Sequence, residues 1–592
     1  MIPTPLELFG ALAPALLCSS MPATPVQDTD VQAEPSAEAY RPVELYDHAE
    51  LNAAILAIAG AHPDRAQTFA IGSSRAGREV LGLRLSGANS GAPARPGILL
   101  VAGLDGARAY TSSMALDHAM RLANEYGSDD AITALLDTTT VYVLPRLDAD
   151  ACEARFTAPL AEVSATGRGV DNDRDSRSGE DPPADVNGDG FISSMRVVDP
   201  EGEWLADPTD PRAMREAKGD EGERGHWKVY TEGHDADGDE RVAEDAPLDA
   251  VLNRNFPRGW EEHAPDAGIY PTHEPQVRSM AEFLLDHTDI ALVMTYGDEG
   301  NLVEDPESQG DDGPSQRGSF ETGVFESDLP VYAEIGSRYS KLTGNETKGL
   351  GEQGGSFQGF AYHHRGLFCL DIDPWSVPLD AELEAGDEEE SDETAAEHEN
   401  IDEEEQEEAP EAGDDAKRLV WFDLNGQADA YIPWTAFDHP QLGAVEIGGF
   451  RPYALVEPPA AILAEITAKH FEFLLTLGAY LPRLELTEVE GKSLGSGLYE
   501  INAVLENNAL LPQPSHAGVR SRTVRPARVR LSLPQGAELL GGRAEELVMN
   551  LDAVNGRHEL KWLVGGIDDP GAIRVMVETN NAGQVSASVE VK

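Results

Sequence analysis

Four short apolar segments restrict the fold of this chain more than any other feature. They cover residues 97–104, 139–147, 290–297 and 367–373 and are rich in Leu, Ile and Val. Such runs are typical of strands buried on both faces of a parallel sheet. Amphipathic patterns with a helical period separate them, at 46–63, 111–127 and 274–288. The alternation predicts an α/β fold with a mainly parallel or mixed sheet flanked by helices.

The pattern changes near residue 480. Short alternating strands with Gly, Pro and Asn turns follow, which predicts a β-sandwich over 481–592. We expect 42–480 to form the α/β domain, with two insertions. One insertion, 168–250, is rich in Asp. The other, 380–416, consists mostly of Asp and Glu, so it buries too little apolar surface to fold and is expected to be disordered.

Charge and cysteine content exclude several classes of protein. The net charge of -63 opposes binding to nucleic acid, because the phosphates would be repelled. Three cysteines, Cys18, Cys152 and Cys369, are too few for a disulfide scaffold or a Cys-rich zinc site. Whether Cys152 and Cys369 pair is left open.

The N-terminal segment indicates export. Residues 1–23 are similar to the apolar region of a signal peptide, although a basic start is missing, and 24–41 read as a tether. We therefore expect a periplasmic or secreted protein, with lipid attachment at Cys18 as a weaker alternative. No other apolar stretch is long enough to span a membrane.

Three segments, in order, resemble the M14 zinc carboxypeptidases, the carboxypeptidase A-like peptidases. They are IGSSRAGREV at 71–80, NRNFPRGW at 253–260 and GSFQGFAYHHRGLFCLDIDPW at 355–375. The resemblance implies a site in which a zinc ion with three protein ligands activates water. A glutamate then acts as the general base, and an Asn–Arg pair binds the C-terminal carboxylate of the peptide.

The residues at the zinc positions differ from the family pattern. The His-x-x-Glu turn of the family falls on Asp105 and Arg108, its later His falls near Met294, and the base falls on Asp373. No His in the chain is followed three residues later by Glu. A cationic Arg108 would repel a dication, so the resemblance implies a family member whose zinc ligands are substituted. A site rebuilt from Asp105, Asp373, Asp371 and the pair His363–His364 is a weaker alternative.

The substrate-binding pair of the family matches Asn253 and Arg254. The cleft is therefore predicted to bind peptide C-termini without cutting them. In the alternative interpretation, Arg254 only pairs with Asp105 or Asp373 in a cleft that has no ligand.

The first insertion contains three segments with oxygen side chains at alternating positions, the spacing that surrounds a calcium ion. The segment at 185–192 lacks the terminal Glu of an EF-hand, whereas the segments at 171–181 and 235–245 have Glu and Asp at positions ten and eleven. The alternative is an acidic surface loop in which Asp and Gly only form turns. The candidate ligands are Asp171, Asp173, Asp175, Asp185, Asn187, Asp189, Asp235, Asp237 and Asp239.

The residues thus favour an exported, catalytically impaired M14 homologue that contains calcium loops and binds peptide or protein C-termini. Two alternatives stay open. The first is an active metallocarboxypeptidase that holds zinc through other ligands, with Asp373 as the base. The second is a structural or adhesion protein stabilised by calcium.

Overall fold

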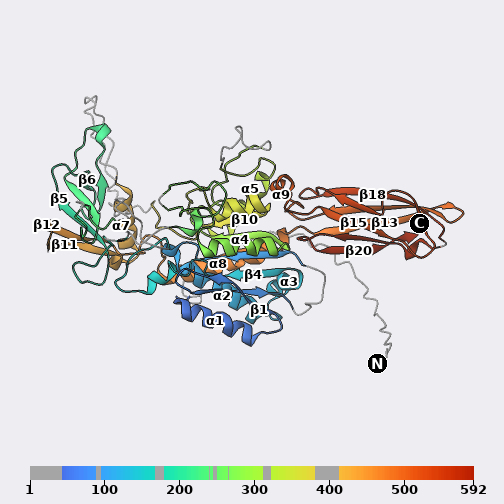
Figure 1. Ribbon diagram of the computed structural model, residues 1–592, viewed down its shortest axis with the longest axis horizontal. Helices are drawn as coiled ribbons and strands as arrows, with labels where there is room; N and C mark the ends of the chain where they lie inside the picture. Colours follow the sequence, from blue (N-terminus) through green and yellow to red (C-terminus); the bar gives the residue numbers. More distant parts are fainter. Residues whose placement is uncertain are drawn as a thin grey trace, which may run out of the picture.

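The computed structural model describes residues 43–87, 95–166, 179, 181–238, 241–244, 250–264, 266–310, 322–379, 412–567 and 569–591. The chain forms an elongated molecule with three parts in a row (Figure 1). An α/β unit lies in the middle, a small β unit at one end and a C-terminal β-sandwich at the other. The predicted signal peptide, the tether, residues 380–411 of the acidic insertion and the candidate ligands Asp171, Asp173, Asp175 and Asp239 lie outside the described residues.

The central unit is built on a six-stranded sheet of order β1-β2-β4-β3-β9-β10. β4, β3, β9 and β10 run parallel, and β1 and β2 are antiparallel additions at one edge. This confirms the predicted mixed sheet. The strands are β1 Ala66–Ser73, β2 Glu79–Leu85, β3 Gly97–Val101, β4 Thr140–Leu144, β9 Ile290–Tyr296 and β10 Phe368–Ile372.

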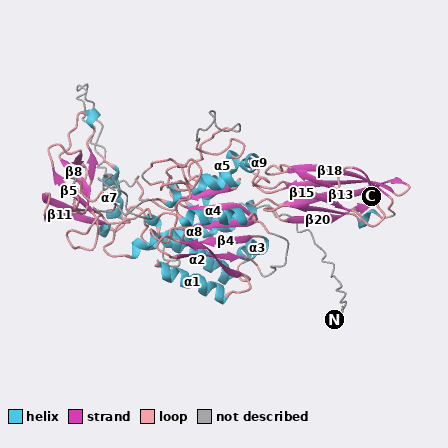
Figure 2. Cartoon of the chain, viewed as in Figure 1, coloured by secondary structure: helices cyan, strands magenta, loops and turns pink. Residues whose placement is uncertain are grey.

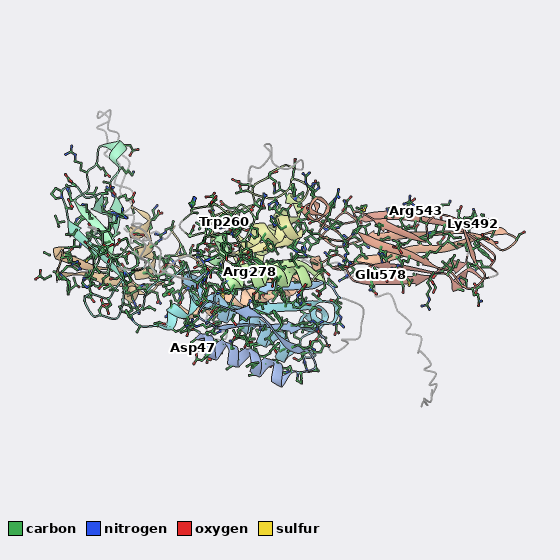
Figure 3. The ribbon with its side chains drawn as sticks, in the orientation of Figure 1. Asp47, Trp260, Arg278, Lys492, Arg543 and Glu578 are labelled. Carbon is green, nitrogen blue, oxygen red and sulfur yellow. The ribbon has the colours of Figure 1, made fainter. Side chains whose placement is uncertain are left out.

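Helices cover both faces of the sheet (Figure 2). One face packs against α1 His48–Ala61, α2 Tyr110–Glu125, α3 Asp130–Thr138, α5 Leu329–Thr343 and α8 Ala460–Tyr480, and the other packs against α4 Pro275–Asp286. α1 begins where Asp47, labelled in Figure 3, accepts the backbone N–H of Glu50 at 2.8 Å. This capping box satisfies backbone donors that the first turn leaves unpaired. None of the helices in the described ranges has the length and apolar character needed to cross a membrane.

The small β unit combines strands that are far apart in the sequence. β5 to β8 come from the first insertion, whereas β11 and β12 come from residues 431–450, and the sheet order is β11-β12-β5-β8-β6-β7. Glu446 on β12 pairs with Arg196 on β5. The strands are β5 Ser194–Val198, β6 Trp204–Ala206, β7 Met214–Glu216, β8 Trp227–Thr231, β11 Tyr431–His439 and β12 Gly443–Phe450.

Helix α7, Asp414–Leu424, corrects one predicted boundary. The acidic insertion was expected to be disordered to residue 416, yet this helix already begins at Asp414. Asp414 and Asp415 lie in its first turn, where negative charge is favourable to the helix dipole. Ala416 and Leu419 pack into a small apolar cluster with Tyr431. Apolar packing and the favourable charge at the helix N-terminus therefore stabilise a helix in the last residues of the predicted acidic insertion.

The C-terminal part consists of two sheets packed around one apolar core, which confirms the predicted β-sandwich. Their orders are β16-β18-β14-β13-β21 and β17-β15-β19-β20. In Figure 3 this C-terminal part is the one that carries the labelled residues Lys492, Arg543 and Glu578. Its strands are β13 Leu484–Gly495, β14 Leu498–Asn507, β15 Ala527–Ser532, β16 Glu538–Gly541, β17 Glu545–Val548, β18 Gly556–Gly565, β19 Arg574–Glu578, β20 Gln584–Ser588 and β21 Glu590–Val591.

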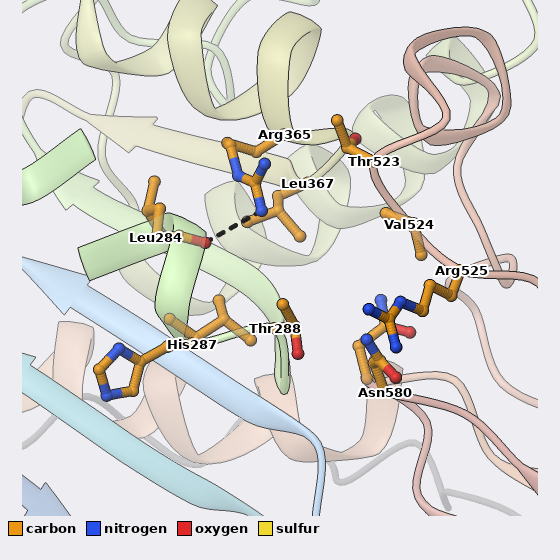
Figure 4. A pocket seen from close by; sticks show the side chains of 11 residues that line it. Leu284, His287, Thr288, Arg365, Leu367, Thr523, Val524, Arg525 and Asn580 are labelled. Carbon is orange, nitrogen blue, oxygen red and sulfur yellow. Dashed lines mark hydrogen bonds between the residues drawn. The ribbon is translucent and has the colours of Figure 1, made fainter. Parts of the chain in front are cut away.

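The sandwich is docked on the central unit through the short helix α9, His516–Ser521. The buried carboxylate of Asp328 accepts the backbone N–H groups of His516 and Ala517 at 3.0 and 3.2 Å. It also accepts the hydroxyl of Tyr362 at 2.7 Å. A small pocket lies at the same junction, where Arg365 donates to the carbonyl of Leu284 at 3.1 Å (Figure 4).

Candidate functional site

The candidate site lies at the carboxyl edge of the central sheet, where residues that follow parallel strands meet. The chain leaves β3 through Gly103, whose φ of +57° and close approach to Arg146 favour glycine. Asp105 then opens a short 3-10 turn, Gly106–Arg108, and its Oδ1 accepts the N–H of Ala107 at 2.9 Å. This cap fixes the position of Arg108 relative to the end of β10.

Arg108 bridges the two carboxylates of the site. Its Nη1 lies 2.9 Å from Oδ2 of Asp105, and its Nη2 lies 2.7 Å from Oδ2 of Asp373. Nε adds a longer contact of 3.3 Å to Oδ1 of Asp373, so that pair is bidentate. The three side chains are buried, with 13, 10 and 5% of their surface exposed. The structure therefore brings together three of the sequence-predicted site residues.

Burial and the ion pairs act in opposite directions on these groups. The pKa of Asp105 is raised to about 6 and that of Asp373 is also raised, because the effect of burial exceeds the lowering effect of Arg108. Burial also opposes the charge of Arg108, but Asp373 and Asp105 outweigh it and raise the pKa of the guanidinium. Asp298, in the loop after β9, raises the pKa of both carboxyls through its negative charge. Arg108 is therefore a permanent cation in a site of excess negative charge.

A second set of polar residues forms a hydrogen-bonded network that ends at the backbone carbonyl of Asp373. The amide of Asn345 donates to the backbone carbonyl of Asp373 at 2.8 Å and to the hydroxyl of Tyr339 at 2.7 Å. The Tyr339 hydroxyl lies 2.9 Å from Nε2 of His470, whose Nδ1 lies 2.7 Å from the carbonyl of Ile466. Burial lowers the pKa of His470 to about 4, so the ring is neutral. The sequence offers no motif for this network, because its members are far apart along the chain.

Asn253 and Arg254 follow one another in the short turn Leu252–Arg254. The buried Oδ1 of Asn253 accepts the N–H of Phe357 at 2.9 Å. Nε of Arg254 lies 3.2 Å from Asp266, and its Nη1 donates to Gln353 at 2.9 Å. The alternative in which Arg254 pairs with Asp105 or Asp373 is therefore wrong, because Arg108 already bridges those two carboxylates.

The weaker alternative metal set is not assembled. Asp371 accepts hydrogen bonds from the hydroxyl of Thr295 at 2.5 Å and from the N–H groups of Glu299 and Gly300 at 3.1 and 2.9 Å. These donors occupy its oxygens within the protein. His363 lies in the π-helical turn Phe360–His364, with Nε2 3.0 Å from the carbonyl of Gly323. Both groups are therefore held by structural contacts.

The predicted calcium segment at 185–192 forms a compact turn. Asp185 accepts the N–H groups of Gly188, Asp189 and Gly190 at 2.7, 3.1 and 2.9 Å. Asn187 and Asp189 bond to one another at 2.8 and 3.0 Å. These bonds are those of an Asp- and Gly-rich turn. Calcium at this segment stays a prediction.

The comparisons with known proteins identify the class. Residues 51–390 match the zinc carboxypeptidase family, and this match covers more than half of the chain. The chain belongs to the zinc carboxypeptidase family. Residues 483–590 match a domain of unknown function, DUF8731. No curated protein matches the chain.

The solved structures that are similar to the chain include a carboxypeptidase A and thrombin activatable fibrinolysis inhibitor. Thrombin activatable fibrinolysis inhibitor is 15% identical, with 57% of this chain and 71% of that chain covered and a TM-score of 0.33. Carboxypeptidase A from Helicoverpa armigera is 14% identical, with 56 and 64% covered and a TM-score of 0.35. The bovine inhibitor in complex with tick carboxypeptidase inhibitor is 12% identical, with 74 and 96% covered and a TM-score of 0.33.

The residues of the site do not fit the zinc ion that the family name implies. Zinc is held by His, Cys, Asp or Glu in a tetrahedral shell. Here a guanidinium lies between Asp105 and Asp373, in the space that a cation would need. Met294 is fully buried in the apolar core of the sheet. Within the described ranges, the one cluster of at least three His, Cys, Asp or Glu ligands lies in the small β unit instead.

Proposed function

We propose that this zinc carboxypeptidase relative binds the C-terminal carboxylate of a peptide or protein and does not hydrolyse it by the zinc route of its family. The observation behind the proposal is the buried bridge from Asp105 through Arg108 to Asp373. Arg108 forms an ion pair with each of the two carboxylates that stand at the predicted metal site. A dication would have to displace a cation that two buried anions hold.

Arg254 is the residue proposed to bind the carboxylate. About a third of its side chain is exposed, at 32%, and its partner Asp266 is 39% exposed. A pair this exposed contributes about 1 kcal/mol or less, so a peptide carboxylate is able to compete for the guanidinium. Nη2 of Arg254 makes no hydrogen bond to any residue that the structure describes. Arginine binds a carboxylate through two parallel N–H groups on neighbouring nitrogens, and a peptide carboxylate that displaced Asp266 would gain Nε together with Nη2.

The proposal includes an exported protein, with 42–480 as the peptide-binding domain and 481–592 as a second domain. The apolar segment in 1–23 supports export, and lipid attachment at Cys18 remains the alternative. Calcium in the first insertion is part of the proposal, supported by the oxygen-rich spacing of its segments. The negative charge of -63 supports peptide rather than nucleic-acid partners.

Peptide binding is tested by calorimetry with N-acetylated tripeptides that differ in their last residue. Each is used as the free acid and as the C-terminal amide. We expect the acid to bind at least about tenfold more tightly than the amide, and Arg254→Ala to remove that difference. Arg278→Ala is the control, because Arg278 is an exposed arginine on α4 of the same unit. Equal binding of acid and amide would favour the structural or adhesion alternative.

The enzyme alternative is tested by elemental mass spectrometry of dialysed protein. We expect well below one zinc per chain and no release of C-terminal residues from the same peptides. One zinc per chain that is lost on Asp105→Ala, together with peptide hydrolysis, would establish the metallocarboxypeptidase instead.

A further inference from the structure

Two Asp-rich segments that the sequence presents as separate loops meet in the small β unit. Asp181 is the last residue of the segment 171–181, and Asp237 and Glu244 belong to the segment 235–245. One carboxylate oxygen from each of the three residues lies within 4.8 Å of the other two. The unit that holds them carries β5, β6, β11 and β12 in Figure 1, at the opposite end of the molecule from the sandwich.

Asp181 is the anchor of this cluster. It is 1% exposed, and its Oδ1 accepts the N–H groups of Ala236 and Asp237 at 2.7 and 3.0 Å. These bonds hold Ala236 and Asp237 against Asp181. Its Oδ2 is also buried but has no hydrogen-bond partner among the described residues. A buried carboxylate oxygen without a hydrogen-bond donor costs free energy, and a bound cation would offset that cost.

We infer that Asp181, Asp237 and Glu244 form one calcium site shared by the two segments. Calcium–oxygen distances are about 2.3–2.6 Å, so oxygens on opposite sides of the ion lie up to about 5 Å apart. The observed separation of at most 4.8 Å fits that span. The donors are all hard carboxylate oxygens, which suit calcium better than zinc. Asp237 is exposed, so water can complete the shell of six to eight ligands.

The position of the site gives it a structural role. The segment that holds Asp237 also contacts the turn between β11 and β12, because the N–H of Asp235 donates to Gln441 at 3.1 Å. Nε2 of His439 lies 3.0 Å from the carbonyl of Gly233. The apolar core beneath is small and contains five buried residues, Met195, Val242, Ala243, Val445 and Ile447. A calcium ion would join the insertion to the hairpin where hydrophobic burial alone is limited.

The test uses the full chain, stripped with chelator and titrated with CaCl2 by calorimetry. About 150 mM salt screens weak binding to the acidic surface. We expect Asp181→Asn to remove one calcium equivalent or weaken it at least tenfold, and Glu244→Gln to weaken the same equivalent. Asparagine keeps the Oδ1 acceptor for Ala236 and Asp237, so the fold of the segment is preserved. Asp438→Asn on β11 makes the same change at an exposed position and should leave the titration unchanged.

Calcium should also raise the melting temperature of wild type and of Asp438→Asn, but not that of Asp181→Asn. Two results would overturn the inference. One is an unchanged calcium titration in both Asp181→Asn and Glu244→Gln, which would mean that the three carboxylates bind no calcium and make contacts only within the protein. The other is loss of the equivalent only in Asp185→Asn, which would place the ion in the 185–192 turn. Neither result depends on whether Arg254 binds a peptide.

Discussion

Replacing Arg108 by Met tests the central feature of the candidate site. Methionine keeps an unbranched side chain but removes the charge, so Asp105 and Asp373 lose the cation that lies 2.9 and 2.7 Å from them. Both residues are buried, with 7 and 5% exposure. Breaking a buried ion pair costs about 3–5 kcal/mol, because the remaining charge is left uncompensated. We expect a loss of about 4 kcal/mol in the free energy of unfolding at pH 8.

The destabilisation caused by Arg108→Met should depend on pH in a defined direction. Burial raises the pKa of Asp105 to about 6 and also raises that of Asp373, and Arg108 is the group that lowers both. Without Arg108 the two pKa values rise further. A carboxyl with a raised pKa takes up protons on folding, so it is least destabilising below its unfolded pKa and stability falls as pH rises through its folded pKa. The cost of the substitution should therefore be smaller at pH 5 than at pH 8.

Urea unfolding followed by far-UV circular dichroism at both pH values measures this cost for the helical central unit. Arg528→Ala serves as the control, because Arg528 pairs with Glu545 at 3.1 Å with 44 and 50% exposure and should contribute about 1 kcal/mol or less. A cost below about 1 kcal/mol for Arg108→Met, equal at both pH values, would refute the buried bridge.

Two further substitutions test the docking of the sandwich and the packing within the small sheet. Asp328→Ala removes the acceptor of three hydrogen bonds and should cost about 3 kcal/mol. It should also speed hydrogen exchange at residues 516–521 (the helix α9), and unchanged exchange there would contradict the proposed docking. In the small sheet, Arg196 lies 4.6 and 4.3 Å from the rings of Trp227 and Trp434. Arg196→Ala should cost about 2 kcal/mol and shift the tryptophan emission to the red, and an unchanged spectrum would count against the stacking.

Much of the central unit could be predicted because its signals are local. An apolar run such as 97–104 allows little besides a buried strand, and the structure has β3 there. The small sheet gave no such signal. Its strands are as short as three residues, and most of their side chains are only partly buried. The pairing of Glu446 with Arg196 joins segments about 250 residues apart, which periodicity cannot detect.

By itself, the sequence determined the α/β fold and the β-sandwich and predicted the position of the candidate site. It could do so because the hydrophobic periodicity and the ends of strands can be recognised from neighbouring residues. The resemblance to the family also predicted that Asp105, Arg108 and Asp373 stand at the positions of its zinc site. Only the tertiary structure decided which groups pair. The turn at Gly106–Arg108 directs Arg108, and not Arg254, between the two carboxylates. It likewise brought Asp181 to Asp237 and Glu244, because a contact between distant segments depends on how the whole chain packs.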